Sequence, residues 1–240
     1  MIEFIWNNCV NFQEKKEYLI NIIKNKNFSN IILNSHQNTN KKELVLLFLK
    51  KFYNEINIKD YVLIINANED GGIKIIRDKV KNFASSMINS NNFSKNYYFK
   101  TIVIENAHIL TQDAQNALRR IMEDFSRITR FILIIEDDRT IIDALFSRCS
   151  YLYFPIYEKE LLIKICHQFF PDINHKDKFI EISNYNIYKM KNYYRIFKSI
   201  NDEINFFNVI ENNIFKYNSN NSSIDFFIKR DAGCPISLNI

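Results

Sequence analysis

The sequence has 240 residues, of which 47% are hydrophobic and 25% charged, and its formal net charge is +5. This length suggests one or two domains at roughly 150 residues each, and the composition excludes a wholly disordered or fibrous chain. Only three glycines occur, and because tight phosphate-binding loops rely on glycine, the composition argues against such a loop.

The first part of the chain alternates short apolar runs with amphipathic segments. The apolar runs predict buried strands at residues 31–33, 61–65, 101–104, 131–135 and 151–154. Apolar residues at spacings of three and four predict helices at residues 12–24, 42–53, 73–87 and 114–125. Because strands that alternate with helices favour right-handed crossovers, we expect an α/β domain with a mostly parallel sheet over residues 1–156.

The pattern changes after Pro155. Helical periodicity continues at residues 158–170, 176–182 and 190–200 without strands between them, which predicts an all-α unit over residues 157–217. Residues 205–217 carry a further helix-like apolar face, which would dock either on this unit or on another subunit. The polar segment 218–240 is expected to be loosely ordered.

Targeting and redox features are missing from the sequence. No apolar run approaches the roughly 20 residues that a membrane span needs, and the N-terminal segment lacks the features of a signal peptide. The cysteines form no CxxC pair, and they are Cys9, Cys149, Cys166 and Cys234. We therefore expect an intracellular protein with no disulfide framework, no metal site and no membrane partner.

Two features near the middle of the chain have alternative interpretations. The run 136–138, EDD, would suit the metal cluster of a nuclease, but adjacent carboxylates after a strand are more typical of a solvated turn. Cys149 stands beside Arg148, yet a reactive thiol also needs a base and an exposed position, so core packing is the simpler interpretation.

A basic helix is expected after the second strand. Residues 66–87 read NANEDGGIKIIRDKVKNFASSM, and the expected exposed positions hold Lys74, Arg77, Lys79 and Lys81. A helix N-terminus beside basic side chains suits phosphate contacts, because the helix dipole, the free N–H groups and the side-chain charges all favour an anion. The alternative interpretation is a solvated helix face.

Three motifs resemble those of one family. Residues 66–87 resemble its block N-A-S-D-E-R-G-I-D-V-[IV]-R-[DN]-K-[IV]-K-x-F-A-S. The segment ENAHILTQDAQNALRRIMEDFSRITRFILI resembles D-E-A-D-x-[LM]-T-x-[DE]-A-Q-x-A-L-R-R-x-M-E-x-[FY]-S-x-x-T-R-F-[IAL]-L, and Ser147-Arg148-Cys149 matches the family's S-R-C motif. The chain thereby resembles the small subunits of replication factor C, the sliding-clamp loader. This resemblance implies an AAA+ parallel sheet domain followed by a small all-α lid domain, with the family's collar domain absent or vestigial.

The Walker A motif of that family is altered. Its pattern G-P-x-G-x-G-K-[ST] aligns with residues 35–42, SHQNTNKK. Lys41 falls at the lysine position, every glycine is replaced, and Lys42 offers no hydroxyl to a metal ion. Bulkier residues at the glycine positions would obstruct the close approach of a phosphate.

Other parts of the ATP site depart from the family as well. Its Walker B sequence D-E-A-D aligns with ENAH, which begins with Glu105 and Asn106. The amide of Asn106 cannot take a proton from water. Glu136 stands where the family usually has the sensor Asn, and the N-terminal E-K-Y-R-P box has no counterpart. We therefore expect neither ATP hydrolysis nor an ATP cofactor.

The resemblance also implies roles for residues that match the family. Arg148 would be an arginine finger that reaches into a neighbouring subunit's ATP site, and a helix-capping role is the alternative. Phe83 and Met87 would contact the sliding clamp. The duplex backbone of primer–template DNA would be contacted by Lys74, Arg77, Lys79, Lys81, Arg119 and Arg120.

The leading hypothesis is a clamp loader subunit that does not itself hydrolyse ATP. It would act in DNA replication with other loader subunits, a sliding clamp and primer–template DNA. Its place would be at replication sites, in the nucleus of a eukaryote and in the cytoplasm or a viral factory otherwise. The alternatives are a stand-alone DNA- or clamp-binding adaptor derived from such a subunit, and an active ATPase with an unorthodox site.

Overall fold

The computed structural model describes most of the chain as two compact units, Met1–Ile165 and Cys166–Ile240. The residues that it describes are 1–8, 13–36, 39–53, 58–70, 74, 76–86, 99–154, 156–200 and 202–219. The predicted boundary at residue 156 follows the last strand directly, whereas the two units divide inside helix α9 (Lys159–Phe169).

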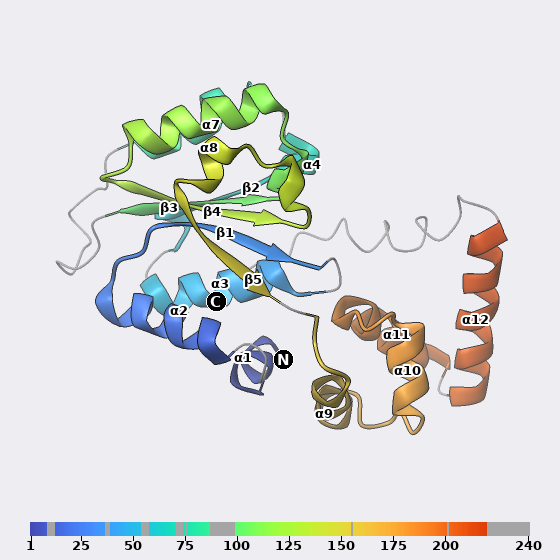
Figure 1. Ribbon diagram of the computed structural model, residues 1–240. Coiled ribbons are helices and arrows are strands. Elements are labelled where there is room, and N and C mark those ends of the chain that lie inside the picture. The colour runs from blue at the N-terminus through green and yellow to red at the C-terminus, as the bar shows by residue number, and fades with distance from the viewer. Residues whose placement is uncertain are drawn as a thin grey trace. The chain divides into compact units, whose positions relative to one another are not determined.

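The first unit is built on a five-stranded sheet in the order β2-β3-β4-β1-β5 (Figure 1). Each pair of neighbouring strands is parallel, with Leu33 paired to Ile134 on one side and to Leu152 on the other. The strands are β1 (Asn30–Ser35), β2 (Val62–Asn66), β3 (Lys100–Glu105), β4 (Thr129–Ile135) and β5 (Cys149–Phe154). All five predicted strands are thus confirmed, as is the parallel sheet.

Helices cover both faces of this sheet (Figure 1). Helices α2 (Gln13–Asn25) and α3 (Lys41–Tyr53) lie on one face, and α7 (Gln112–Asp124) and α8 (Asp143–Phe146) lie on the other. The Thr111 hydroxyl caps α7 by accepting the Ala114 N–H. Shorter helical elements are η2 (Ile58–Asp60), α4 (Ala67–Asp70), η5 (Ala107–Ile109) and η6 (Asp138–Thr140).

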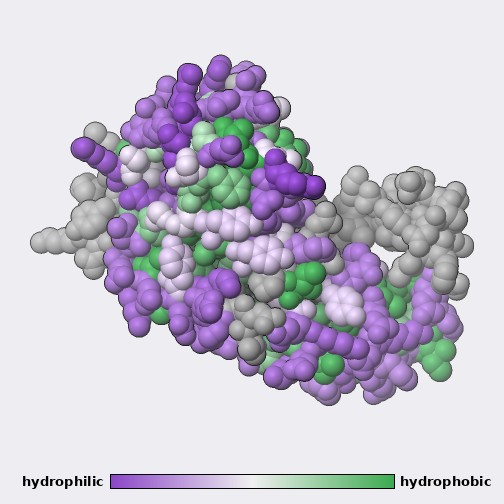
Figure 2. Space-filling model, in the orientation of Figure 1, coloured by the Kyte–Doolittle hydropathy of each residue, from purple (hydrophilic) through white to green (hydrophobic). Residues whose placement is uncertain are grey.

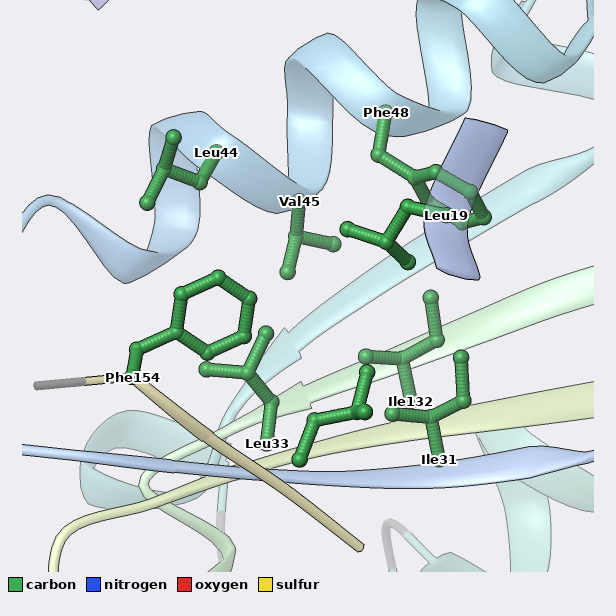
Figure 3. A pocket seen from close by; sticks show the side chains of 9 residues that line it. Leu19, Ile31, Leu33, Leu44, Val45, Phe48, Ile132 and Phe154 are labelled. Atoms are coloured by element: carbon green, nitrogen blue, oxygen red, sulfur yellow. The ribbon is translucent and has the colours of Figure 1, made fainter. Parts of the chain in front are cut away.

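The α3 face of the sheet contains a small apolar pocket (Figure 3). Its lining side chains are all apolar, and they are Leu19, Ile31, Leu33, Leu44, Val45, Phe48, Ile132, Leu152 and Phe154. Because specific ligand sites combine apolar walls with a few placed polar groups, this pocket belongs to the packing of α2 and α3 on the sheet.

Helix α1 (Ile2–Asn8) was not predicted from the sequence. It packs against α3 and buries Ile5 and Trp6, which are 1% and 4% exposed. A helix of only seven residues provides too short a periodic signal for a prediction from the sequence.

The segment predicted as one helix over residues 73–87 differs from an ordinary α-helix. A π-helix, η3 (Ile76–Val80), is followed directly by α6 (Lys81–Ser85). Ile76, Val80 and Ala84 are all fully buried in the core. In an α-helix every fourth residue turns away by about 40°, and the wider π turn offsets that drift, so the three side chains stay on one face.

The second unit is helical, as predicted. It contains α10 (Lys176–Ile182), α11 (Ile187–Ile200) and α12 (Glu203–Ser219). Phe206 of α12 lies 6.2 Å from Phe179 and 5.7 Å from Phe197, measured between ring centroids. The apolar face predicted at residues 205–217 therefore docks within this unit through Phe206. Residues 220–240 of the predicted tail lie outside the described residues.

No helix in the described part of the chain is both long enough and apolar enough to cross a membrane.

Candidate functional site

The carboxyl ends of β1, β3 and β4 bring charged side chains together. Parallel strands end at the same edge of a sheet, so the loops after them are neighbours. Lys41 and Lys42 begin α3 after the β1 loop, Glu105 ends β3, and Glu136 follows β4. The structure thus brings together the four residues at this edge that the sequence singled out for their charge.

Lys41 forms the tightest of these contacts. Its Nζ lies 2.5 Å from Glu136 Oε1 and 3.4 Å from the Ser35 carbonyl oxygen. The Lys41 side chain is only 11% exposed and that of Glu136 is 22% exposed. Burial lowers the pKa of Lys41, and the neighbouring Glu136 carboxylate acts in the opposite direction by favouring the charged ammonium.

Lys42 also lies within ion-pair distance of a carboxylate, although the contacting oxygen, Glu105 Oε1, has no hydrogen-bond partner among the described residues. Its Nζ lies 2.8 Å from Glu105 Oε1, with the lysine side chain 50% exposed and the carboxylate 13% exposed. The charge of Glu105 is therefore balanced by a lysine in the first turn of α3. Each lysine at this edge has a carboxylate of the same chain within ion-pair distance.

Asn106 is held in a chain of side-chain amides. Its backbone is left-handed, with φ 54° and ψ 37°, a conformation that Asn tolerates better than most residues. Its Nδ2 donates to Asn66 Oδ1 at 3.0 Å, and Asn66 Nδ2 donates to Glu69 Oε1 at 3.1 Å. The residue aligned with the family's catalytic carboxylate is therefore bound to another amide.

The last two residues before α3, Thr39 and Asn40, are buried. Asn40 is 1% exposed, and its side-chain oxygen and nitrogen have no hydrogen-bond partner among the described residues. Its backbone N–H donates to the Tyr157 hydroxyl at 3.2 Å. The Thr39 hydroxyl donates to Ser35 Oγ at 2.8 Å. Thr39 and Asn40 are therefore held by contacts with Ser35 and Tyr157.

The acidic run after β4 is divided among separate partners. Besides the Glu136–Lys41 pair, Asp137 holds the guanidinium of Arg139 at 2.8 Å, and Asp138 accepts the Tyr151 hydroxyl at 3.2 Å. The described residues contain no group of three or more His, Cys, Asp or Glu side chains that could hold a metal ion. The run therefore resembles the solvated turn more than a metal cluster.

His108 lies on the same edge of the sheet. Its Nδ1 accepts the Glu136 backbone N–H at 3.4 Å. Burial lowers the pKa of His108, and Lys41 lowers it further while Glu136 acts against both. A neutral imidazole is consistent with that acceptor role.

Arg148 lies away from the lysines, between α8 and β5. Its NH2 nitrogen lies 2.5 Å from Glu123 Oε1 of α7, and its NH1 donates to the Ala144 carbonyl oxygen at 2.6 Å. The Arg148 side chain is 35% exposed and that of Glu123 is 40% exposed. The same Glu123 oxygen lies 3.9 Å from Arg119 NH1. Arg148 therefore caps α8, as the alternative interpretation had it, while a third of its side chain remains exposed.

Cys149, next to Arg148, packs against the hydrophobic core. Burial raises the pKa of its thiol to about 12, although Arg148 acts to lower it. A thiol with so high a pKa is a poor nucleophile near neutral pH. The structure agrees with the core-packing interpretation.

All the predicted basic residues except Lys74 lie on η3, on α6, which follows η3 directly, or on α7. Helix α7 packs against η3, and hydrophilic residues dominate the surface over α7 at the top of Figure 2. Arg119 is one-third exposed. The exposed members are Lys74, Arg77, Lys79, Lys81 and Arg120.

Of the two residues predicted to contact a clamp, the structure describes Phe83 but not Met87. Phe83 of α6 is partly buried against the core, and Lys100 Nζ lies 4.9 Å from the centre of its ring. Lys100 itself is 4% exposed and donates to the Ser86 carbonyl oxygen at 2.7 Å. Met87 lies outside the described residues.

Sequence reasoning missed several residues that organise these sites. Gln115 of α7 is 1% exposed, donates to the Thr140 carbonyl oxygen and accepts the Ile142 N–H. It thereby ties α7 to the segment that leads to Arg148. A polar residue on the apolar face of α7 was the available signal, because a buried amide needs partners.

Comparison with known proteins places this site in a family. Residues 12–158 match the family model described as DNA polymerase III, delta subunit. The chain is 33% identical to replication factor C subunit 4 of Arabidopsis thaliana over 159 residues, covering 65% of this chain and 47% of that protein. It is 34% identical to replication factor C subunit 5 of Homo sapiens over 157 residues, covering 65% and 45%. The chain spans less than half the length of these curated relatives.

Solved structures share the fold. A DNA polymerase III gamma subunit-related protein from Thermotoga maritima superposes with a TM-score of 0.59 at 18% identity, covering 75% of this chain and 57% of that one. The RuvB Holliday junction branch migration motor of the same organism gives 0.58 at 10% identity, covering 82% and 67%. At these identities the likeness concerns the AAA+ fold alone.

Proposed function

The chain belongs to the family described as DNA polymerase III, delta subunit, and from that membership we propose that it is a clamp loader subunit of replication factor C type that does not hydrolyse ATP. It would act in DNA replication together with other clamp loader subunits, a sliding clamp and primer–template DNA. The resemblance to replication factor C small subunits extends to relatives that are 33% to 38% identical.

The observation that carries the proposal is the pairing of Lys41 with Glu136 and of Lys42 with Glu105. The lysine of a phosphate-binding loop contacts phosphate, and the residue after it holds the magnesium ion through a hydroxyl. Here both positions are lysines that already contact carboxylates, so the residues present do not fit ATP. We therefore assign the site no nucleotide cofactor.

Asn106 supports the same proposal, because it stands where hydrolysis would need a general base. Hydrolysis needs a base that orients and deprotonates the attacking water. An amide lacks that basicity, and Asn106 already donates to Asn66. Even a nucleotide that entered this site would therefore find no general base at this position.

Arg148 would allow the subunit to assist ATP hydrolysis in a neighbouring subunit. A guanidinium beside a transferring phosphoryl group stabilises the negative charge that develops in the transition state. The exposed face of Arg148 is free to reach such a group only after its contact with Glu123 is released. An exposed ion pair contributes about 0–1 kcal/mol, so this release is inexpensive.

The basic surface supports contact with DNA. Exposed Arg77, Lys79 and Lys81 lie on η3 and α6, and Arg120 lies on the adjacent α7. We expect these side chains to contact phosphates, and phosphate contacts carry no sequence information. Phe83 and Met87 would contribute to the clamp contact, and the subunit would act at replication sites.

The second candidate function is a stand-alone adaptor that binds DNA or a clamp. One observation favours it: the guanidinium of Arg148 is satisfied within its own chain by Glu123 and the Ala144 carbonyl oxygen. In that case the S-R-C motif would remain for structural reasons only.

The deciding experiment is native mass spectrometry after affinity purification of the tagged protein from its source cell. Recovery in a complex with other loader subunits would support the clamp loader proposal. Recovery as a single copy bound only to a clamp would favour the adaptor and contradict the proposal.

A further inference from the structure

We propose that Glu136 and Glu105 are resident anions, which occupy the positions beside Lys41 and Lys42 where a phosphate ligand would place its oxygens. The two carboxylates thereby decide what this site can bind, because their charge excludes phosphates and phosphate esters. The inference rests on the proposed function in one respect, since both treat this edge of the sheet as the remnant of a nucleotide site.

The charges at this edge cancel. Lys41 and Lys42 carry two positive charges, and Glu136 and Glu105 carry two negative ones within 2.5 and 2.8 Å. A phosphate that approached the lysines would also approach these two carboxylates. Like charges at such separations repel strongly where solvent is largely excluded, and Lys41, Glu136 and Glu105 are all at least three-quarters buried.

The positions of Glu105 and Glu136 favour these carboxylates over a free anion as partners of the two lysines. Glu105 and Glu136 stand at the ends of the adjacent strands β3 and β4, and both strands are central in the sheet. Their positions are therefore fixed by the sheet, whereas a free anion loses translational freedom on binding. A fixed carboxylate competes with a free phosphate at a high effective concentration.

The surroundings of the lysines also match a site designed for an anion. Lys41 is mostly desolvated and needs a counter-charge, and the buried amide of Asn40 stands beside it in sequence without a partner among the described residues. Removing the charge of Glu136 should leave the Lys41 ammonium without a counter-charge. An added phosphate should then bind and supply that negative charge.

The test is pyrophosphate binding to Glu136→Gln, measured by isothermal titration calorimetry at constant ionic strength. Glutamine keeps the shape of Glu136 and removes its charge. We expect pyrophosphate to bind the variant at least tenfold more tightly than the wild type. Adding Glu105→Gln should strengthen binding further, and adding Lys41→Met to Glu136→Gln should return it to the wild-type level.

The matched control is Asp138→Asn. It removes the same charge from the same turn, but its carboxylate accepts the Tyr151 hydroxyl rather than forming either lysine pair. We expect no more than a twofold change for this control. An equal response of Asp138→Asn and Glu136→Gln would overturn the proposal, because a general change in net charge would then explain the binding.

Glu105→Gln decides the matter if Glu136→Gln fails to fold. Its partner Lys42 is half-exposed, so water can solvate that lysine once its carboxylate is gone. A several-fold gain in pyrophosphate affinity would support resident anions, and an unchanged affinity would overturn them. Neither titration involves other subunits, so an absence of loader subunits in the affinity purification would contradict the proposed function and leave this inference standing.

Discussion

Two ion pairs of similar length have different surroundings. Lys41 and Glu136 lie 2.5 Å apart with side chains that are 11% and 22% exposed, whereas Arg148 and Glu123 lie equally close with 35% and 40% exposed. A desolvated cation that loses its anion is costly, while an exposed pair contributes about 0–1 kcal/mol. Distance alone therefore does not distinguish a permanent contact from one that can open, and exposure does.

The two pairs also differ in how far the sequence around them matches the family. Around Lys41 the glycines and the hydroxyl of the family's loop are replaced, and around Arg148 the S-R-C motif is retained. Lysines that are already paired, together with a separate arginine that can be released, fit a subunit that serves a neighbour's reaction and has none of its own. The predictions below test that contrast.

The largest effect is expected for Arg148→Ala. In a reconstituted loader this variant should lower the DNA- and clamp-stimulated ATPase rate by about 10³-fold, as for other arginine fingers. Arg148→Lys should restore little, because a point charge cannot reproduce the planar two-pronged contact. The steady-state rate of the reconstituted complex is the measurement.

Glu123→Gln is the matched control for Arg148→Ala. It removes the partner of Arg148 and keeps the guanidinium, so the rate should stay within a few-fold of the wild type. Full activity of Arg148→Ala would show that the S-R-C motif persists for helix capping, and would move the assignment to the adaptor.

The next effect is on stability. Glu136→Gln should lower the free energy of unfolding by about 1–3 kcal/mol, because it leaves a mostly buried lysine without its anion. Glu123→Gln should change it by no more than about 0.5 kcal/mol, since water solvates the exposed arginine. Urea denaturation of both variants is the measurement, and equal losses would remove the contrast between the two pairs.

A smaller effect is expected on DNA binding. Replacing Arg77 and Lys81 together by alanine should reduce the slope of log affinity against log salt by about 0.9 per lost contact. The control replaces Lys24 and Lys50, which are exposed on α2 and α3 at the opposite face of the sheet (Figure 1). If both double variants behave alike, the basic residues of η3 and α6 form only a solvated surface.

The smallest effect concerns alkaline stability. The pKa of Cys149 is raised from its usual 9.0 to about 12, so the folded state keeps a proton that the unfolded state loses between those pH values. Its contribution to stability is complete below pH 9 and falls as the pH rises toward 12. Cys149→Ala should flatten the loss between pH 8 and 10 by up to about 1 kcal/mol, and an unchanged pH profile would contradict the burial of this thiol.

Much of the fold was predictable from local patterns. Uninterrupted apolar runs such as that at residues 131–135 predicted the strands, because strands covered on both faces bury every side chain. The wide turn at Ile76–Val80 was not predictable in the same way. The π turn keeps Ile76, Val80 and Ala84, which are spaced every fourth residue, on the side that faces the core. That requirement becomes visible only in the packed structure.

The candidate site was predictable in its residue types and not in its contacts. Glu136 was recognised as a replacement for the family's Asn, yet its pairing with Lys41 joins residues 95 positions apart in sequence. Glu123 likewise attracted no notice, because an acid on an exposed helix face resembles any other until its partner is seen. Long-range ion pairs depend on sheet order, and no local pattern encodes that order.

The most direct test of the account is ATP binding to the isolated wild-type protein, measured by isothermal titration calorimetry. We expect no binding at millimolar ATP, because Lys41 and Lys42 already contact carboxylates and the loop before α3 has no glycine at the positions where the family has them. A dissociation constant below about 10 μM, which corresponds to roughly −7 kcal/mol, would contradict it.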